Sequence, residues 1–132
     1  MINIRTGVWE TNSSSVHSLI MTDEDTYKKL ERGDLLIGGY NTDFEDEFIT
    51  YEQAYQTLKE LFEKYPDFYA EYGVTDLDEC TRDYIEEIMG REDIAYTLDT
   101  YGGSGNYYEK FEDFYTTPKG EKVVAFGYYG HD

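Results

Sequence analysis

The pattern of apolar and polar positions predicts a hairpin at the start of the chain. Residues 2–9 alternate well enough for a strand, and residues 16–21 predict a second strand. Between them, residues 10–15 read Glu-Thr-Asn-Ser-Ser-Ser, a polar run typical of a turn. We therefore expect two strands joined at this turn, and if Val8 pairs with Val16, Glu10 and His17 would approach each other at its tip.

Three stretches carry start and stop signals for helices: residues 22–33, 50–66 and 75–90. Each begins at a threonine that is a suitable N-cap, and in the second stretch Gln53 completes a capping box with Thr50. A glycine ends the first and third stretches, and a proline ends the second. Apolar stripes at helical spacing follow in the second stretch (Ala54, Tyr55, Leu58, Leu61, Phe62, Tyr65) and in the third (Leu77, Cys80, Tyr84, Ile85, Ile88).

Further strands are expected at residues 34–39, 94–101, 107–115 and 123–126. The last of these, Val-Val-Ala-Phe, is continuously apolar, which favours a strand covered on both faces. Helices and strands do not alternate regularly, so an α+β fold is expected rather than a wound parallel sheet. We predict one domain over residues 1–132, with a mostly antiparallel sheet of four to six strands and about three helices.

Charge excludes several classes of partner. Asp and Glu number 29 against 11 Lys and Arg, which gives a formal net charge of −18. DNA binding depends on cationic side chains that displace counterions from phosphates, so direct nucleic-acid binding is not expected, and anionic membranes are disfavoured for the same reason. The aromatic share of 17% argues for a folded core rather than an acidic disordered chain. The expected partner is a basic surface on another protein, although the charge is equally suited to a role in solubility alone.

Compartment signals are few. The chain has one cysteine, Cys80, which suits a reducing cytosol, and residues 1–10 lack the basic and apolar regions of a signal peptide. No apolar run approaches the length of a membrane span. We therefore expect a cytoplasmic protein.

Two segments interleave carboxylates with aromatic rings: residues 43–48 and residues 107–115. Carboxylates pair with Arg and Lys, and rings stack on guanidinium planes, so such a surface imitates what a nucleic acid offers to a basic groove. An ordinary strand, with rings inward and acids outward, is the alternative, and calcium binding by the first segment is disfavoured because it lacks a calcium-loop order. The candidate partner-binding residues are Asp43, Glu45, Asp46, Glu47, Glu109, Glu112 and Asp113.

A metal site is a second possibility. Glu10 and His17 flank the Ser-rich turn, and together with Cys80, or with His131, they offer ligands that zinc accepts. The chain has no Cys-x-x-Cys and no His-x-x-x-His spacing, so the alternative is that Cys80 is a core residue and His17 an ordinary strand residue.

Catalysis is not expected. Ser13, Ser14 and Ser15 precede His17, but no Gly-x-Ser-x-Gly elbow is present, and serines in a turn usually serve local backbone hydrogen bonds. The glycine-rich residues 102–106 lack the lysine and the following helix of a phosphate loop.

Both ends of the chain carry a resemblance. Residues 5–18, Arg-Thr-Gly-Val-Trp-Glu-Thr-Asn-Ser-Ser-Ser-Val-His-Ser, and residues 120–132, Gly-Glu-Lys-Val-Val-Ala-Phe-Gly-Tyr-Tyr-Gly-His-Asp, resemble the ends of a family of small proteins from Gram-positive bacteria and their phages, largely without assigned function. If that family uses its opening motif chemically, the resemblance implies that Glu10 and His17 form a paired site. In size and charge the chain also resembles anti-CRISPR inhibitors, which block an RNA-guided nuclease at its basic nucleic-acid channels or its recognition lobe. This second resemblance is one of type and transfers no residue.

Together these observations favour a non-enzymatic binding protein of the bacterial cytoplasm, an anti-CRISPR-like inhibitor that occupies a basic nucleic-acid-binding surface of a partner such as an RNA-guided nuclease. A zinc-binding metalloprotein and a phage accessory or structural protein remain as alternatives.

Overall fold

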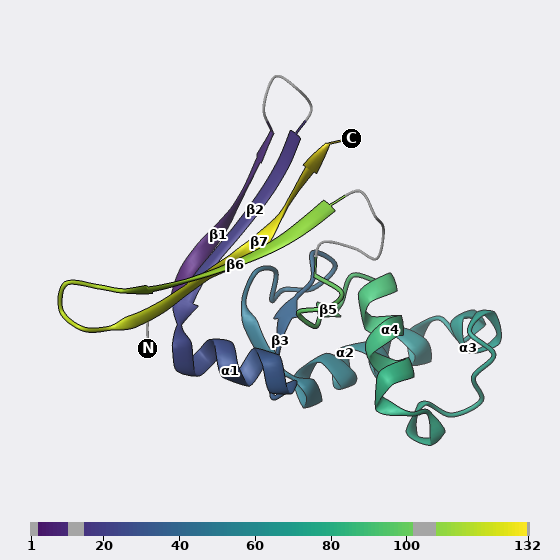
Figure 1. The fold of residues 1–132 in the computed structure, drawn as a ribbon. Coiled ribbons are helices and arrows are strands. Elements are labelled where there is room, and N and C mark those ends of the chain that lie inside the picture. Colours follow the sequence, from purple (N-terminus) through teal and green to yellow (C-terminus); the bar gives the residue numbers. More distant parts are fainter. Residues whose placement is uncertain (1–2, 11–14, 102–107, 132) are drawn as a thin grey trace.

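The computed structural model describes residues 3–10, 15–101 and 108–131, and side chains over residues 19–101 and 109–128. The described part has an α+β fold, as predicted, and all its strand pairs are antiparallel. The strands divide between two sheets rather than forming one (Figure 1). Two hydrophobic clusters lie on either side of the apolar strand β3, which is the middle strand of the smaller sheet.

The first sheet has four strands in the order β1-β2-β7-β6. Their bounds are β1 Asn3–Glu10, β2 Ser15–Asp23, β6 Tyr108–Thr116 and β7 Lys122–His131. The predicted hairpin is present, with Val8 opposite Ser18, and β1 carries an irregularity between Ile4 and Gly7 where the register shifts. The condition that Val8 pairs with Val16 is therefore not met, since Val16 lies opposite Glu10.

The second sheet has three strands in the order β4-β3-β5, with β3 Leu35–Gly38, β4 Phe48–Thr50 and β5 Ala95–Tyr96. Strand β3 is apolar throughout, and successive side chains of a strand point to opposite faces. Leu36 accordingly enters one hydrophobic cluster and Ile37 the other. This strand links the two clusters.

The helices are α1 Glu24–Arg32, α2 Tyr51–Lys64, α3 Asp67–Glu71 and α4 Arg82–Arg91, with a 3-10 turn at Leu77–Glu79. The capping box of Thr50 and Gln53 is present, and Gly33 ends α1 with φ 81°. Two predicted caps are wrong. Strand β2 continues to Asp23, so Asp23 rather than Thr22 caps α1, and Thr81 rather than Thr75 caps the third predicted helix.

The two clusters have different surroundings. The first, between α2, α4 and the three-stranded sheet, includes Leu58, Phe62, Ile85, Ile88 and Met89, and each of these is at most 1% exposed. The second lies where α1 and Ile37 of β3 meet the four-stranded sheet, and it contains Ile20, Tyr27, Leu30, Val124 and Phe126. Figure 1 shows the resulting arrangement, in which β3 and β5 lie between the long four-stranded sheet and helices α2 to α4. Strand β6 forms one edge of the four-stranded sheet.

Several carboxylates of this acidic chain are hydrogen-bonded by tyrosine hydroxyls rather than by Lys or Arg. Among described residues, hydrogen bonds of this kind run from a tyrosine hydroxyl to a carboxylate in these pairs: Tyr27 to Glu112, Tyr55 to Asp78, Tyr72 to Glu92 and Tyr96 to Asp93. Burial and the neighbouring carboxylate both raise the pKa of each of these phenols. A neutral phenol can satisfy a carboxylate without a positive charge, which suits a chain with so few Lys and Arg.

Candidate partner-binding surface

Strand β6 presents acids and rings to solvent together. Side chains alternate between the two faces of a strand, so a strand with one buried face shows alternating exposure. In β6, Glu112, Asp113, Phe114 and Tyr115 are all exposed, with Phe114 56% and Tyr115 49% accessible. Strand β6 is an edge strand, and residues that alternate along it remain exposed even though α1 contacts one of its faces. The expectation that the rings of this segment mix with its acids at the surface agrees with these exposures.

The neighbouring strand β7 behaves differently. Its run Val123, Val124, Ala125 and Phe126 is buried throughout, at 5% exposure or less, as the continuous apolar pattern predicted. It lies between β2 and β6, so both of its edges are hydrogen-bonded. This strand gives the exposed residues of β6 a rigid support.

Tyr27 of α1 holds the inner face of β6. Its hydroxyl donates to Glu112, and its ring meets the ring of Phe114 edge to face, with centroids 5.9 Å apart. The same tyrosine is only 4% exposed and packs on Phe126. One buried side chain therefore positions one acid and one ring of the candidate surface.

The lysines of the hairpin formed by β6 and β7 do not all lie among the carboxylates of β6. The ammonium of Lys110 donates to the backbone carbonyls of Leu98, at 3.1 Å, and Asp99, so it is engaged with the connection after β5. Lys119 lies in the turn between β6 and β7, and Lys122 is the first residue of β7, so both lie beyond Tyr115. The stretch from Glu109 to Asp113 therefore keeps three carboxylates against one cation that is occupied elsewhere.

The second acidic segment, residues 43–47, connects β3 to β4 and so belongs to the other sheet. Asp43, Glu45 and Glu47 are exposed and Asp46 is partly buried in a left-handed conformation, with φ 64°. Here the rings turn inward: Phe44 packs on the cluster around α2 and Phe48 on the cluster around α1. This segment has the two-faced arrangement that was the alternative prediction, although Tyr40 just before it is 62% exposed.

The predicted metal ligands are placed only in part. Glu10 lies opposite Val16 and His17 opposite Trp9 in the β1–β2 pairing, and the side chains of Glu10, His17 and His131 lie outside the described residues.

Cys80 packs against the cluster of α2 and α4, where its thiol approaches the carbonyl of Asp76 at 3.7 Å. Burial and the carboxylates of Asp76 and Glu79 raise the pKa of that thiol, which disfavours the thiolate that zinc requires. Among the side chains that the structure describes, no group of three His, Cys, Asp or Glu residues is arranged to hold a metal ion. Zinc binding through Glu10 and His17 stays a prediction.

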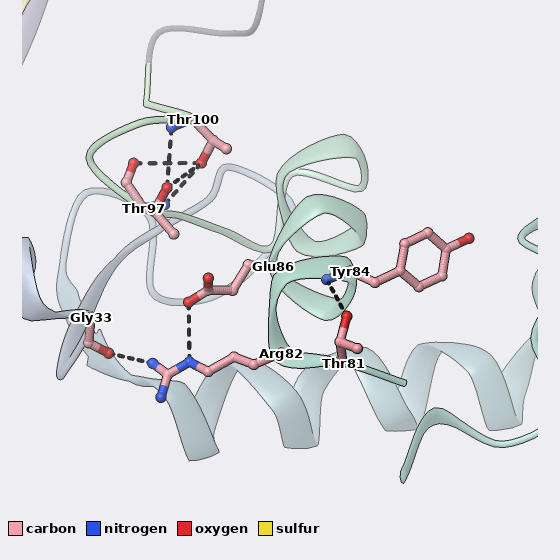
Figure 2. A network of polar contacts seen from close by, with 7 residues as sticks. All are labelled: Gly33, Thr81, Arg82, Tyr84, Glu86, Thr97 and Thr100. Carbon is pink, nitrogen blue, oxygen red and sulfur yellow. Dashed lines mark hydrogen bonds and ion pairs between the residues drawn. The ribbon is translucent and has the colours of Figure 1, made fainter. Parts of the chain in front are cut away.

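The cavity beside β6 offers no unengaged cation to an anionic ligand. It measures about 780 Å³ and includes Arg32, Arg82 and Lys110 in its lining. Arg82 donates to the carbonyl of Gly33 and pairs with Glu86 at 3.3 Å, as Figure 2 shows, and Arg32 pairs with Asp34 at 3.0 Å. Lys110 is held by carbonyls, as described above. The cavity lies where α1, α4 and the four-stranded sheet meet, and its cations are too engaged to form an anion site.

Sequence reasoning missed Tyr27 and the connection after β5. Tyr27 and Leu30 are spaced at i, i+3 in the first helix, a signal that could have placed Tyr27 in the core. The predicted strand at residues 94–101 is wrong beyond Tyr96, because Thr97 and Thr100 close a turn in which the amide of each donates to the hydroxyl of the other, at 2.9 and 3.1 Å (Figure 2). That turn carries the carbonyls that hold Lys110.

Comparisons with known proteins add no family. No protein-family model, no curated protein and no solved structure matches the chain. The resemblance of its two ends to small proteins of Gram-positive bacteria and phages therefore stays a prediction. None of the described helices is both long enough and apolar enough to cross a membrane.

Proposed function

We propose that this chain is a non-enzymatic binding protein that occupies a basic, nucleic-acid-binding surface of another protein, in the manner of an anti-CRISPR inhibitor. The observation that carries the proposal is the joint exposure of Glu112, Asp113, Phe114 and Tyr115 on one edge strand. The partner class is an RNA-guided nuclease of the bacterial host, and the site of action is the bacterial cytoplasm.

The chemistry of β6 suits such a partner. A groove that holds nucleic acid presents Arg and Lys, which pair with carboxylates, and its guanidinium planes stack on aromatic rings. Phe114 and Tyr115 supply the apolar contact area that dominates binding energy at interfaces, while Glu109 and Asp113 supply charge. The net charge of −18 steers the encounter with a cationic partner and makes its rate fall with salt.

A direct binding assay tests the proposal. Immobilised chain is exposed to a purified, guide-loaded nuclease at low and at high salt, and again after the nuclease has been saturated with target DNA. We expect binding that weakens with salt, because exposed charges are screened within about 10 Å at 0.1 M ionic strength. We also expect target DNA to prevent it, because both ligands would occupy the same basic surface. Binding that survives DNA saturation unchanged contradicts occupation of the nucleic-acid surface.

Charge-reversal pairs locate the surface. The first variant, on β6, combines Glu109→Lys with Asp113→Lys. The second, on the other acidic segment, combines Asp43→Lys with Glu45→Lys. The third, at exposed positions outside both segments, combines Glu79→Lys with Glu87→Lys. All three pairs change the net charge equally, so a difference between them reports position rather than total charge. We expect the β6 pair to weaken binding most. Equal weakening by all three pairs would show that only the overall charge matters.

A further inference from the structure

The exposed aromatic side chains point to a second surface, away from β6. Four large hydrophobic residues stand out as exposed among the described residues, and two of them are Phe114 and Tyr115 of β6. The others are Tyr65, at 49%, which follows α2, and Tyr40, at 62%, which follows the three-stranded sheet. Tyr65 lines a groove, and so does Asn41, the residue after Tyr40. Tyr65 therefore belongs to a concave surface, whereas Tyr40 is not among the residues that line it.

This groove has an apolar floor. It measures about 580 Å³ and lies between the end of α2, helix α3 and the start of β5. Its apolar lining consists of Leu61, Tyr65, Phe68 and Ile94. Ile94 is only 2% exposed, and Phe68 packs against Tyr65 edge to face at 6.0 Å and stacks on Phe62 at 5.9 Å. Leu61, Phe68 and Ile94 therefore belong to the first hydrophobic cluster, which holds them in place, and Tyr65 contacts it through Phe68.

The rim of the groove is strongly acidic. Its charged lining residues are Glu60, Asp67, Glu71 and Glu92 against one cation, Lys64. The ammonium of Lys64 lies 5.5 Å from the centre of the Tyr65 ring, and the carboxylate of Glu92 accepts from the hydroxyl of Tyr72. Glu60, Asp67 and Glu71 are exposed, so three carboxylates face solvent around an apolar floor. The acidic connection between β3 and β4 joins the groove at Asn41, whose amide donates to the carbonyl of Glu92 at 3.0 Å.

We infer that this groove binds a basic peptide segment in which a large apolar side chain is flanked by Lys or Arg. The apolar side chain occupies the floor beside Tyr65 and Phe68, and its cationic neighbours pair with Glu60, Asp67 and Glu71. The charge of the rim selects this occupant, since an acidic segment or an anionic membrane would be repelled and a neutral segment would gain no ion pairs. The groove and β6 are formed by different elements, so this inference does not depend on the function proposed above.

The probe is a fluorescein-labelled peptide in which one phenylalanine is flanked on each side by lysines, titrated with the full chain and followed by fluorescence anisotropy. Two control peptides replace the phenylalanine by glycine or the lysines by glutamates. We expect the first to bind and both controls to bind at least about tenfold more weakly. Equal binding of the glycine peptide would overturn the inference, because attraction to the net charge alone would then explain the affinity.

Two tyrosines of equal exposure provide matched variants. Tyr65 and Tyr115 are each 49% accessible, but only Tyr65 lines the groove. We expect Tyr65→Ala to weaken binding of the phenylalanine peptide about tenfold, as for an interface anchor, and Tyr115→Ala to change it less than about twofold. Circular dichroism and the urea midpoint verify that both variants fold.

Charge reversal separates the groove from the rest of the surface. Glu60→Lys with Glu71→Lys should weaken peptide binding about tenfold, whereas Glu109→Lys with Asp113→Lys, the same change in net charge on β6, should leave it within about twofold. Amide shifts on peptide binding should concentrate at Leu61, Phe68 and Ile94. Equal losses from the two pairs, or shifts concentrated on β6, would overturn the inference and leave the proposal for β6 unaffected.

Discussion

The hydroxyl of Tyr27 on α1 donates a hydrogen bond to the carboxylate of Glu112 on β6, across 85 residues of sequence. Burial and this carboxylate raise the pKa of the phenol above its usual value. The bond therefore holds the edge strand to the helix only while the phenol is protonated.

Replacement of Tyr27 by Phe should lower the free energy of unfolding by about 1 kcal/mol at neutral pH, because Glu112 is exposed and regains hydration when the hydroxyl is lost. The pKa of the Tyr27 phenol is raised in the folded state. The stability that the protonated phenol contributes is therefore complete below its unfolded-state pKa of about 10, and it is lost as pH rises through its folded-state pKa. Urea denaturation from pH 7 to pH 11 measures it. The wild-type chain should lose stability above about pH 10 more steeply than Tyr27→Phe, and parallel curves would contradict the role of this bond.

Asp23 provides a prediction at the acidic end. Its carboxylate caps α1 by accepting from the amide of Thr26 at 3.3 Å and from the hydroxyl of Thr26 at 2.6 Å. Partial burial acts to raise the pKa of Asp23, but the hydrogen bonds from Thr26, from Thr22 and from its own backbone together outweigh it, and the pKa is lowered. Asp23→Ala should cost about 1 kcal/mol at neutral pH, the usual cost of losing an N-cap.

The charge of Asp23 can be tested separately from its cap. Because the folded-state pKa is lowered, the charge contributes in full above the unfolded value of about 3.9 and is lost as pH falls through the folded value. Asp23→Asn keeps an acceptor for the cap but cannot titrate. Thermal unfolding at several pH values below about 5 should show a shallower acid dependence for Asp23→Asn than for the wild type.

Arg82 connects three helices. Its guanidinium donates to the carbonyl of Gly33 after α1, pairs with Glu86 one turn along α4, and lies 4.2 Å from the centre of the Tyr51 ring of α2 (Figure 2 shows the first two contacts). Arg82→Ala should cost about 1 to 2 kcal/mol, since it removes a hydrogen bond and a cation–π contact. Arg82→Lys should recover only part of this, because an ammonium lacks the planar fork.

Arg32→Ala is the matched control for Arg82→Ala. Arg32 pairs with Asp34 at 3.0 Å, but both side chains are nearly 60% exposed, at 58% and 59%. Exposed pairs of this kind contribute little, so the variant should change the free energy of unfolding by less than about 0.5 kcal/mol. Chemical denaturation of both variants gives the comparison, and equal costs would show that the three-helix connection adds nothing.

Gly39 lies at a close approach between two chain segments beside the three-stranded sheet. A Cβ atom at this position would lie 2.0 Å from the carbonyl oxygen of Asp93, while the amide of Gly39 donates to the carbonyl of Ile94 at 2.8 Å. Backbone atoms would have to move, so Gly39→Ala should cost about 3 kcal/mol. Gly73 has φ 67° and open space around it, so Gly73→Ala should cost only about 1 kcal/mol. Urea midpoints decide the order, and a reversed order would contradict the close approach.

Local signals in the sequence were reliable where one residue type satisfies a backbone need by itself. The capping box of Thr50 and Gln53 and the left-handed Gly33 are examples, because each depends on atoms a few residues apart. Where two nearby residues both suited an N-cap, the sequence did not decide which of them begins the helix. Thr22 and Asp23 both suit an N-cap, and the choice of Asp23 depends on how far β2 continues along β7, with Thr22 opposite Val124. Thr75 and Thr81 presented the same ambiguity.

For the candidate surface, the sequence determined the acid and aromatic content of both segments, but it could not tell their exposure. Residues 43–48 and 107–115 look alike in pattern, yet Phe44 and Phe48 are drawn into the two clusters while Phe114 and Tyr115 stay in solvent. The difference arises because one segment connects strands of the inner sheet, which is covered on both faces, and the other is an edge strand.

The sequence by itself determined the α+β class, the hairpin at the start of the chain, the buried run of β7 and the net charge, since these follow from local periodicity and composition. Only the tertiary structure decided that β3 separates two clusters, that Tyr27 holds Glu112, and that Tyr65 and Phe68 line an acid-rimmed groove. These relationships join residues that are distant in sequence or depend on how whole elements pack, and hydrophobic burial, which drives that packing, is not directional.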